Sequence, residues 1–203
     1  MRMTGLRNMG IMVSVLAVIL AAGPSPTRAQ MGPQLLITMN LAGPVKEEGG
    51  EYFIAFNADN TILLGPRSDS SYWTHYVLYR GRRFFFGQVP VSPSRPFDFL
   101  TIRPPQPYLF GQVLSDGQSM RVSVSVADLG VSLGSLSRIK VNFLTVDEHL
   151  KPLDTLGRGP GDPFGFVTLD LRKDTFVTIT HAPRNCPDPA FCITGGDIRI
   201  TTP

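Results

Sequence analysis

Prolines and glycines are spread along the chain so evenly that long helices are excluded. The sequence holds 18 prolines and 20 glycines. A proline inside a helix removes a backbone hydrogen bond and clashes with the preceding turn, and a glycine adds an entropic cost. The chain is therefore expected to fold from short extended segments joined by turns.

Several of these segments alternate apolar and polar residues, which is typical of a half-buried strand. The alternation is clear in residues 34–41, 120–126 and 138–145. Pairs with turn chemistry, among them Asp116-Gly117 and Gly195-Gly196, separate the apolar runs. Strands are predicted at residues 34–41, 51–57, 72–79, 83–87, 97–102, 108–114, 119–126, 138–145, 164–171, 175–180 and 197–201. Short strands at this spacing predict an all-β fold, a single antiparallel β-sandwich of the jelly-roll kind.

The first 29 residues have the pattern of a cleaved signal peptide. Arg2 and Arg7 precede the apolar run 9–22, and residues 27–29 (Thr-Arg-Ala) have small side chains where a cleavage site needs them. As a helix the run would span about 21 Å, short of the roughly 30 Å hydrocarbon core of a bilayer. We expect residues 1–29 to be removed and residues 30–203 to form one secreted or periplasmic domain with no stable membrane anchor. An uncleaved N-terminal anchor is the alternative.

The charge of the chain argues against nucleic acid as a partner. The formal net charge of +3 comes from the segment that we expect to be removed, because residues 1–29 hold three arginines and no acid. Nucleic-acid binding needs a basic surface that neutralises phosphates. The one dense basic cluster, Arg80, Arg82 and Arg83, is predicted to be a solvated hairpin tip.

Cys186 and Cys192 are the only cysteines, and a disulfide between them is the expected outcome in an oxidising compartment. Closing so short a loop would contribute about 2.4 kcal/mol by the chain-entropy estimate. The alternatives are a redox pair, which lacks the Cys-x-x-Cys spacing, and a zinc site with His181, which lacks a fourth ligand nearby.

Residues 130–134 match a catalytic motif, the Gly-x-Ser-x-Gly pattern, with Ser132 at its centre. A nucleophile elbow needs a parallel strand before the serine and a helix after it, whereas a strand is predicted after this one. Asp147 with His149, or Asp170 with His181, would be needed to complete a serine triad. A turn between strands is the favoured interpretation, so no catalytic residue is predicted and the chain is not expected to be an enzyme.

No cofactor is expected, although a structural calcium ion is a possible exception. Asn57, Asp59 and Asn60 place oxygen donors at the end of a predicted strand. An Asx-turn explains the same residues equally well.

Aromatic residues concentrate in residues 72–86, where they suggest a binding surface. Period two places Tyr72 and Tyr76 on one face of the predicted strand, and Trp73, His75 and Tyr79 on the other. One face must enter the core, and the other is a candidate platform on which a sugar ring stacks. A central strand that is covered on both sides remains the alternative.

A resemblance to a known class of domains rests on four segments. Residues 51–59, 72–76, 121–130 and 138–143 resemble bacterial secreted DOMON-like domains and domains similar to family-9 carbohydrate-binding modules. The resemblance implies a ligand-binding β-sandwich whose ligand classes are sugars or haem. Haem-binding members use a methionine and a histidine as iron ligands, but no spacing in this chain singles out such a pair.

These observations together predict a secreted, non-catalytic ligand-binding domain, with a glycan or another extracellular molecule as its ligand. The first alternative is an extracytoplasmic structural or envelope protein without a small ligand. The second is an exported hydrolase that uses Ser132 or a pair of carboxylates.

Overall fold

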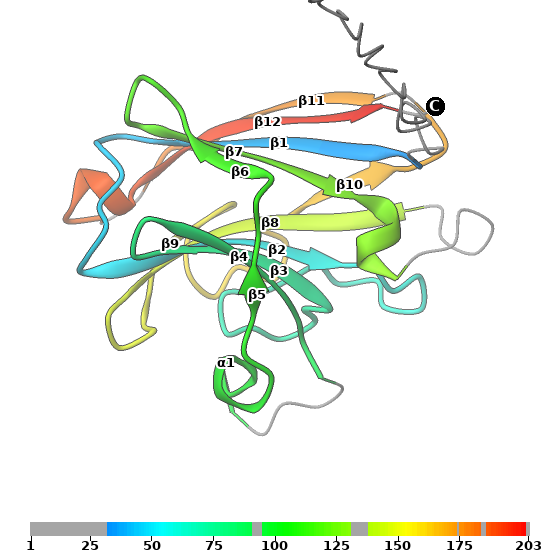
Figure 1. Cartoon of the computed structure of the whole chain (residues 1–203), viewed down its shortest axis with the longest axis horizontal. Coiled ribbons are helices and arrows are strands. Elements are labelled where there is room, and N and C mark those ends of the chain that lie inside the picture. Colours follow the sequence, from blue (N-terminus) through cyan, green and yellow to red (C-terminus); the bar gives the residue numbers. More distant parts are fainter. Residues whose placement is uncertain (1–31, 91–94, 131–137, 174, 184–185, 202–203) are drawn as a thin grey trace, which may run out of the picture.

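The computed structural model describes residues 32–90, 95–130, 138–173, 175–183 and 186–201. In these ranges the chain forms two antiparallel β-sheets stacked face to face (Figure 1), which confirms the predicted all-β sandwich. The segment predicted to be a signal peptide lies outside the described residues. None of the helices in the described ranges is long and apolar enough to span a bilayer.

The first sheet has five strands in the order β11-β12-β1-β7-β6. The second has seven, in the order β10-β8-β2-β3-β4-β5, with β9 also paired to β8. The strands of the first sheet are β11 (Thr175–Thr180), β12 (Ile193–Thr201), β1 (Gln34–Leu41), β7 (Ser119–Ser125) and β6 (Gly111–Val113). Those of the second are β10 (Val167–Asp170), β8 (Arg138–Asp147), β2 (Gly50–Asn57), β3 (His75–Arg80), β4 (Arg83–Gln88), β5 (Gln106–Pro107) and β9 (Pro152–Thr155).

The main core lies between the two sheets. Alternate residues of β1 and β7 point into it, as the sequence pattern predicted, and they meet the inward face of β2 and β8. Its buried members include Ile37, Val122, Ile54, Phe143 and Ile198. Each such side chain contributes about 1.5–3 kcal/mol when it leaves water.

A second core lies on the opposite face of the second sheet. Phe53, Tyr76 and Leu144 point outward from their strands and are buried by loop residues and the short helix α1 (Phe99–Ile102). Figure 1 shows α1 on the side of the second sheet that faces away from the first sheet. Because both faces are covered, β2 and β8 are buried along nearly their whole length, including the uninterrupted apolar run of β2.

The predicted strands at residues 34–41 and 175–180 match β1 and β11, whereas two other predicted strands and one predicted turn are wrong and β9 has no counterpart among the predictions. Residues 97–102 contain α1 instead of a strand, because Phe99 packs into the second core. Of the predicted strand 108–114 only residues 111–113 form a strand, β6, and residues 108–110 cross between the sheets. Gly195-Gly196 is not a turn, since β12 runs through it. Strand β9 was missed because proline and aspartate interrupt its pattern.

The predicted strand 72–79 begins only at His75. Ser70 and Tyr72 have φ angles of 61° and 63°, so the chain turns twice just before the strand. This turn breaks the period-two alternation, and Trp73 therefore lies on the same side of the sheet as Tyr76 and not with His75.

Candidate ligand-binding site

The aromatic residues that the sequence offered as a stacking platform are mostly buried. Trp73, His75, Tyr76 and Tyr79 are 5%, 6%, 0% and 7% exposed, and only Tyr72 reaches 38%. An exposed platform of these rings is therefore not formed. The alternative, a strand covered on both sides, describes the structure, because sheet-on-sheet packing covers one face and the α1 layer covers the other.

The buried rings have structural partners. The indole nitrogen of Trp73 donates to the carbonyl of Arg67 at 2.7 Å, and its ring packs edge-on against Phe97 and Phe53. On the inner face the ring of Tyr79 lies 4.8 Å from that of Phe84. These contacts account for the rings as parts of the two cores.

His75 is buried on the inner face of β3 and stacks on Phe86, with 5.8 Å between the ring centroids. Its Nδ1 lies 3.1 Å from the hydroxyl of Thr74. Burial, with a smaller contribution from the positive charge of Arg103, lowers the pKa of His75 to about 4. The ring is consequently neutral at physiological pH.

The loop considered for calcium is built as an Asx-turn. The side-chain oxygen of Asn57 accepts from the amide of Asp59 at 2.9 Å, and a carboxylate oxygen of Asp59 accepts from the amide of Thr61 at 2.7 Å. The ammonium group of Lys140 donates to the carbonyls of Asp59 and Ile62. The cation that these loop carbonyls bind is thus the ammonium group of Lys140. Groups of three or more metal-ligating His, Cys, Asp or Glu side chains are absent from the described ranges.

The acid and histidine pairs considered for catalysis are not assembled as the sequence suggested. Asp147 accepts from the amide of His149 in a turn, and the carboxylate of Asp170 pairs with Arg172 at 3.0 Å. His181 pairs with Asp154 instead, with Nε2 3.3 Å from Oδ1. Ser132 lies outside the described residues.

Asp154 is fully buried, and backbone amides satisfy its carboxylate. Oδ1 accepts from the amide of Thr155 at 2.9 Å, and Oδ2 accepts from the amide of Ile193 at 2.8 Å. Asp154 consequently joins β9 of the second sheet to Ile193 at the start of β12 and to His181, which directly follows β11 of the first sheet. This arrangement explains the pair as a structural connection between the sheets.

The predicted disulfide is formed. Cys186 and Cys192 have Cα atoms 5.6 Å apart and bonded sulfurs, and the loop they close contains the short 3-10 helix η2 (Pro189–Phe191). Phe191 at the end of this helix stacks on Tyr52, and Asp188 before it pairs with Lys46 at 2.5 Å. The disulfide suits an oxidising environment and fastens the chain entry into β12.

The basic cluster is a hairpin tip, as predicted. Strands β3 and β4 are joined by Gly81 and Arg82, whose φ angles of 56° and 68° are those of a type I′ turn. Arg80 pairs with Glu51 at 3.0 Å, and Arg82 pairs with Glu47. Arg83 is exposed, and among the described residues it has no acidic partner.

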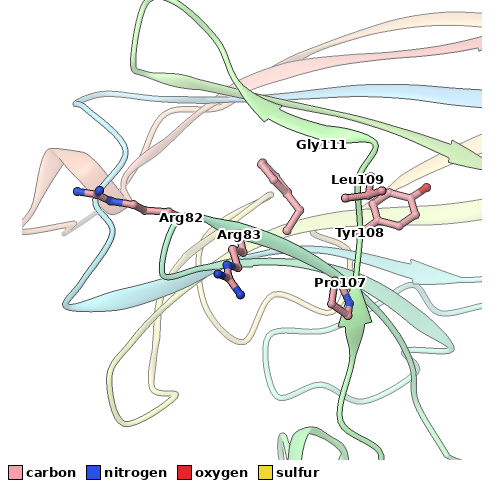
Figure 2. Close-up of a pocket in the computed structure, with 7 residues that line it drawn as sticks. Arg82, Arg83, Pro107, Tyr108, Leu109 and Gly111 are labelled. Atoms are coloured by element: carbon pink, nitrogen blue, oxygen red, sulfur yellow. The ribbon is translucent and has the colours of Figure 1, made fainter.

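Beside this tip lies a pocket of about 390 Å³, here called the edge pocket. Figure 2 shows Arg82 and Arg83 on the hairpin side, and Pro107, Tyr108, Leu109 and Gly111 along the segment that rises past them. The pocket therefore combines guanidinium groups with an apolar and aromatic wall. Its described lining residues are Arg82, Arg83, Phe84, Pro107, Tyr108, Leu109 and Gly111.

The apolar wall belongs to a short crossover segment, residues 108–110, that links the two sheets. The amide of Tyr108 donates to the carbonyl of Phe84 in the second sheet at 2.8 Å. The Tyr108 hydroxyl donates to the carbonyl of Ser123 in the first sheet at 2.7 Å, and the Ser123 amide donates to the carbonyl of Phe110 at 2.9 Å. Both ends of the segment are thus fixed to the sandwich.

Leu109 is held on this fixed segment with 89% of its surface exposed, and Phe110 beside it is 66% exposed. Leu109 and Phe110 also line a second hollow of about 250 Å³, here called the outer-face hollow, and Leu109 and Gly111 line both hollows. Arg121 on β7 supplies a third guanidinium there. The described residues that line the two hollows include no aspartate or glutamate. Exposed apolar side chains on a rigid support, flanked by Arg83 and Arg121, which have no acidic partner among the described residues, have the character of a binding surface.

Sequence reasoning found the arginines of this site but not its apolar wall. Leu109 and Phe110 lie between Pro107 and Gly111, in an apolar run for which the sequence predicts a strand. Prolines upstream at 104, 105 and 107 were the available signal that the run does not continue one regular strand. No pattern in the sequence indicates that Leu109 faces solvent.

Searches against protein-family models, curated proteins and solved structures found no match to this chain.

Proposed function

We propose that the chain is a secreted, non-catalytic binding domain and that its ligand is an acidic carbohydrate held in the edge pocket. The observation that carries the proposal is the exposed, unopposed Arg83 next to the rigidly presented Leu109. The disulfide supports an extracytoplasmic location.

The chemistry of the pocket supports this ligand class. A guanidinium group offers a planar fork of donors that matches a carboxylate or sulfate group on a sugar. The C–H faces of sugar rings pack on apolar and aromatic side chains such as Leu109 and Tyr108. Burial raises the pKa of Tyr108 to about 12, so its hydroxyl stays neutral and keeps the crossover segment attached to β7.

The lining supports binding more than turnover. General acid–base catalysis needs a positioned carboxylic acid, histidine or comparable group. The described residues of the edge pocket include no carboxylate and no histidine, and the hydroxyl of its one tyrosine, Tyr108, is already engaged with the carbonyl of Ser123.

The test is titration calorimetry with an acidic oligosaccharide and a neutral one of the same length. We expect the acidic one to bind, and affinity to fall as salt is raised because the charges lie at the surface. Arg83→Gln should weaken binding about tenfold, and Leu109→Ser should weaken it by a similar factor. Arg158→Gln is the matched control, since Arg158 is an exposed arginine in the loop before β10, at the opposite edge of the second sheet.

Equal affinity for the neutral oligosaccharide, or equal loss from Arg158→Gln, would overturn the proposed site. Absence of binding to any acidic oligosaccharide would favour the alternative, a structural protein of the cell envelope. The observation that favours this alternative is the burial of aromatic rings in the second core. Rings that pack the α1 layer onto the second sheet are not available to contact a ligand.

A further inference from the structure

The outermost strands of the two sheets differ in how well they are protected from pairing with another chain. An unpaired strand edge presents free backbone donors and acceptors, and natural proteins blunt such edges with short strands, prolines, charges or irregular pairing. The edges here are formed by β11 and β6 in the first sheet, and by β5, β9 and β10 in the second.

Four of these five edges are blunted. Strand β5 has two residues, one of which is Pro107, and β6 has three. Strand β9 begins with Pro152 and pairs with a register shift between Thr145 and Val146 of its neighbour. Strand β10 has four residues and ends at Asp170, which pairs with Arg172.

Strand β11 has none of these features. Its six residues, Thr-Phe-Val-Thr-Ile-Thr, include no charge and no proline, and they pair with β12 without a register shift. Val177 and Ile179 pack against the main core but remain only partly buried, and within the described ranges β11 pairs with no strand other than β12. Phe176 on the other face is 66% exposed. The strand is therefore a regular, uncharged template for another strand, without the protective features of the other edges.

We propose that β11 is a self-association edge, which pairs antiparallel with β11 of a second copy of this chain and joins the two first sheets into one. An antiparallel pair of identical strands has a two-fold axis, so the one strand supplies both sides of the contact. The absence of charge within β11 means that no like charges meet across the axis.

The side-chain pattern selects the register. Residues that lie opposite each other across the two strands must point to the same face of the joined sheet. One residue of β11 must therefore lie opposite its own copy across the two-fold axis. Centred on Thr178, the pairing sets Val177 opposite the partner's Ile179, which covers the two half-buried apolar residues of each copy. Thr178 lies opposite the partner's Thr178 on the outward face. A contact of one strand pair is smaller than a standard stable interface, so the dimer is weak and depends on concentration.

The test is sedimentation velocity of the purified protein from low micromolar to near-millimolar concentration. We expect a reversible monomer–dimer equilibrium that Thr178→Lys abolishes, because it sets two ammonium groups opposite each other at the axis. Thr178 is exposed, so the change leaves the fold intact. Thr168→Lys on β10 is the matched control, since Thr168 is also an exposed strand threonine and its variant should dimerise like the unmodified protein.

The register has a separate test. Under mild oxidation Thr178→Cys should give a covalent dimer, because the two residues face each other across the axis. Phe176→Cys, which lies opposite the partner's Thr180, should remain mostly monomeric. A protein that stays monomeric at all concentrations, a dimer that survives Thr178→Lys, or equal cross-linking of both cysteine variants would overturn the proposal.

Discussion

His75 shows how burial changes the chemistry of a single residue in this fold. Its position among the aromatic residues makes it a candidate for contact with a sugar. In the structure it is only 6% exposed, and it pairs with Gln88 of β4. Its pKa of about 4 means that the folded protein resists protonating a ring that the unfolded chain protonates near pH 6.5. The residue thus links stability to pH although it is almost entirely shielded from solvent.

The free energy of unfolding should fall as the pH drops from about 6.5 to about 4. In this window the unfolded state binds a proton on His75 that the folded state does not, so acid favours unfolding, and the stabilisation is complete above the unfolded pKa. The contribution is about 3 kcal/mol at most. His75→Phe keeps a ring against Phe86 and should flatten this part of the profile. Urea unfolding at several pH values measures the difference between variant and unmodified protein.

His149→Gln is the control for this prediction, because the His149 side chain is 82% exposed. Its profile should follow that of the unmodified protein. A His75→Phe profile with the same slope between pH 6.5 and pH 4 as the unmodified protein would contradict the assignment to His75.

At the same scale, sequence reasoning located cationic and covalent features better than apolar ones. The Cys186–Cys192 disulfide and the Arg82-Arg83 tip follow from residue type and local spacing alone. The exposure of Leu109 and the pairing of Asp154 with His181 depend on contacts between segments that are distant in sequence. A single sequence holds no direct signal for such contacts.

Strand β12 is the element whose conformation depends most on particular residues. It pairs on both sides, with β1 and β11, and it contains Gly195 and Gly196 at φ angles of 138° and 156°. A Cβ atom on Gly196 would lie 2.0 Å from the carbonyl oxygen of Thr38 in β1. The glycines therefore permit a close approach of backbones in the middle of the first sheet.

Gly196→Ala should lower the free energy of unfolding by roughly 3 kcal/mol, because it adds both backbone strain and a clash with β1. Denaturant unfolding measures the loss. Hydrogen exchange should show faster exchange of amides in β1 near Thr38, where the strand must move.

Gly117→Ala is the matched control for Gly196→Ala. Gly117 has a φ angle of 67° and no atom within 4 Å of its would-be Cβ, so the variant carries backbone strain alone. It should cost about 1 kcal/mol. An equal cost for the two variants would show that close packing against β1 does not matter.

At the scale of elements, regular alternation of apolar and polar residues predicts strands reliably. Segments without such alternation were predicted less well. Strands β1 and β11 have one inner and one outer face, so period two identifies them. Helix α1 has four residues, and Phe99 is the only one of them that is buried. So short a helix has no periodicity that a sequence pattern could reveal. In β12 the glycine pair has the chemistry of a turn, and only the two neighbouring strands make it extended.

For the whole molecule, the second sheet is shared by two hydrophobic cores. Along β2, Phe53 points into the second core and Ile54 into the main core. Removing either core would expose one face of strands that are apolar on both sides. The α1 layer is therefore expected to be part of one cooperative unit and not a separable cover.

This expectation predicts that the two cores unfold together. Trp73, the only tryptophan, lies in the second core, so its fluorescence reports that layer, while far-ultraviolet circular dichroism reports the strands. The two unfolding curves should coincide. Phe99→Ala removes a fully buried ring from the second core and should lower stability by about 3–5 kcal/mol, with the curves still superimposed.

Ile37→Ala in the main core is the matched variant, because Ile37 is equally buried but lies between the sheets. It should also shift the fluorescence of Trp73, which it does not touch, to lower denaturant, since both cores share β2, β3 and β8. If Phe99→Ala releases Trp73 before the strands unfold, or if Ile37→Ala leaves the fluorescence curve in place, the two layers fold independently. In that case the α1 layer would be free to open without the sandwich, and the burial of Trp73 and Tyr76 would describe a closed state of this layer.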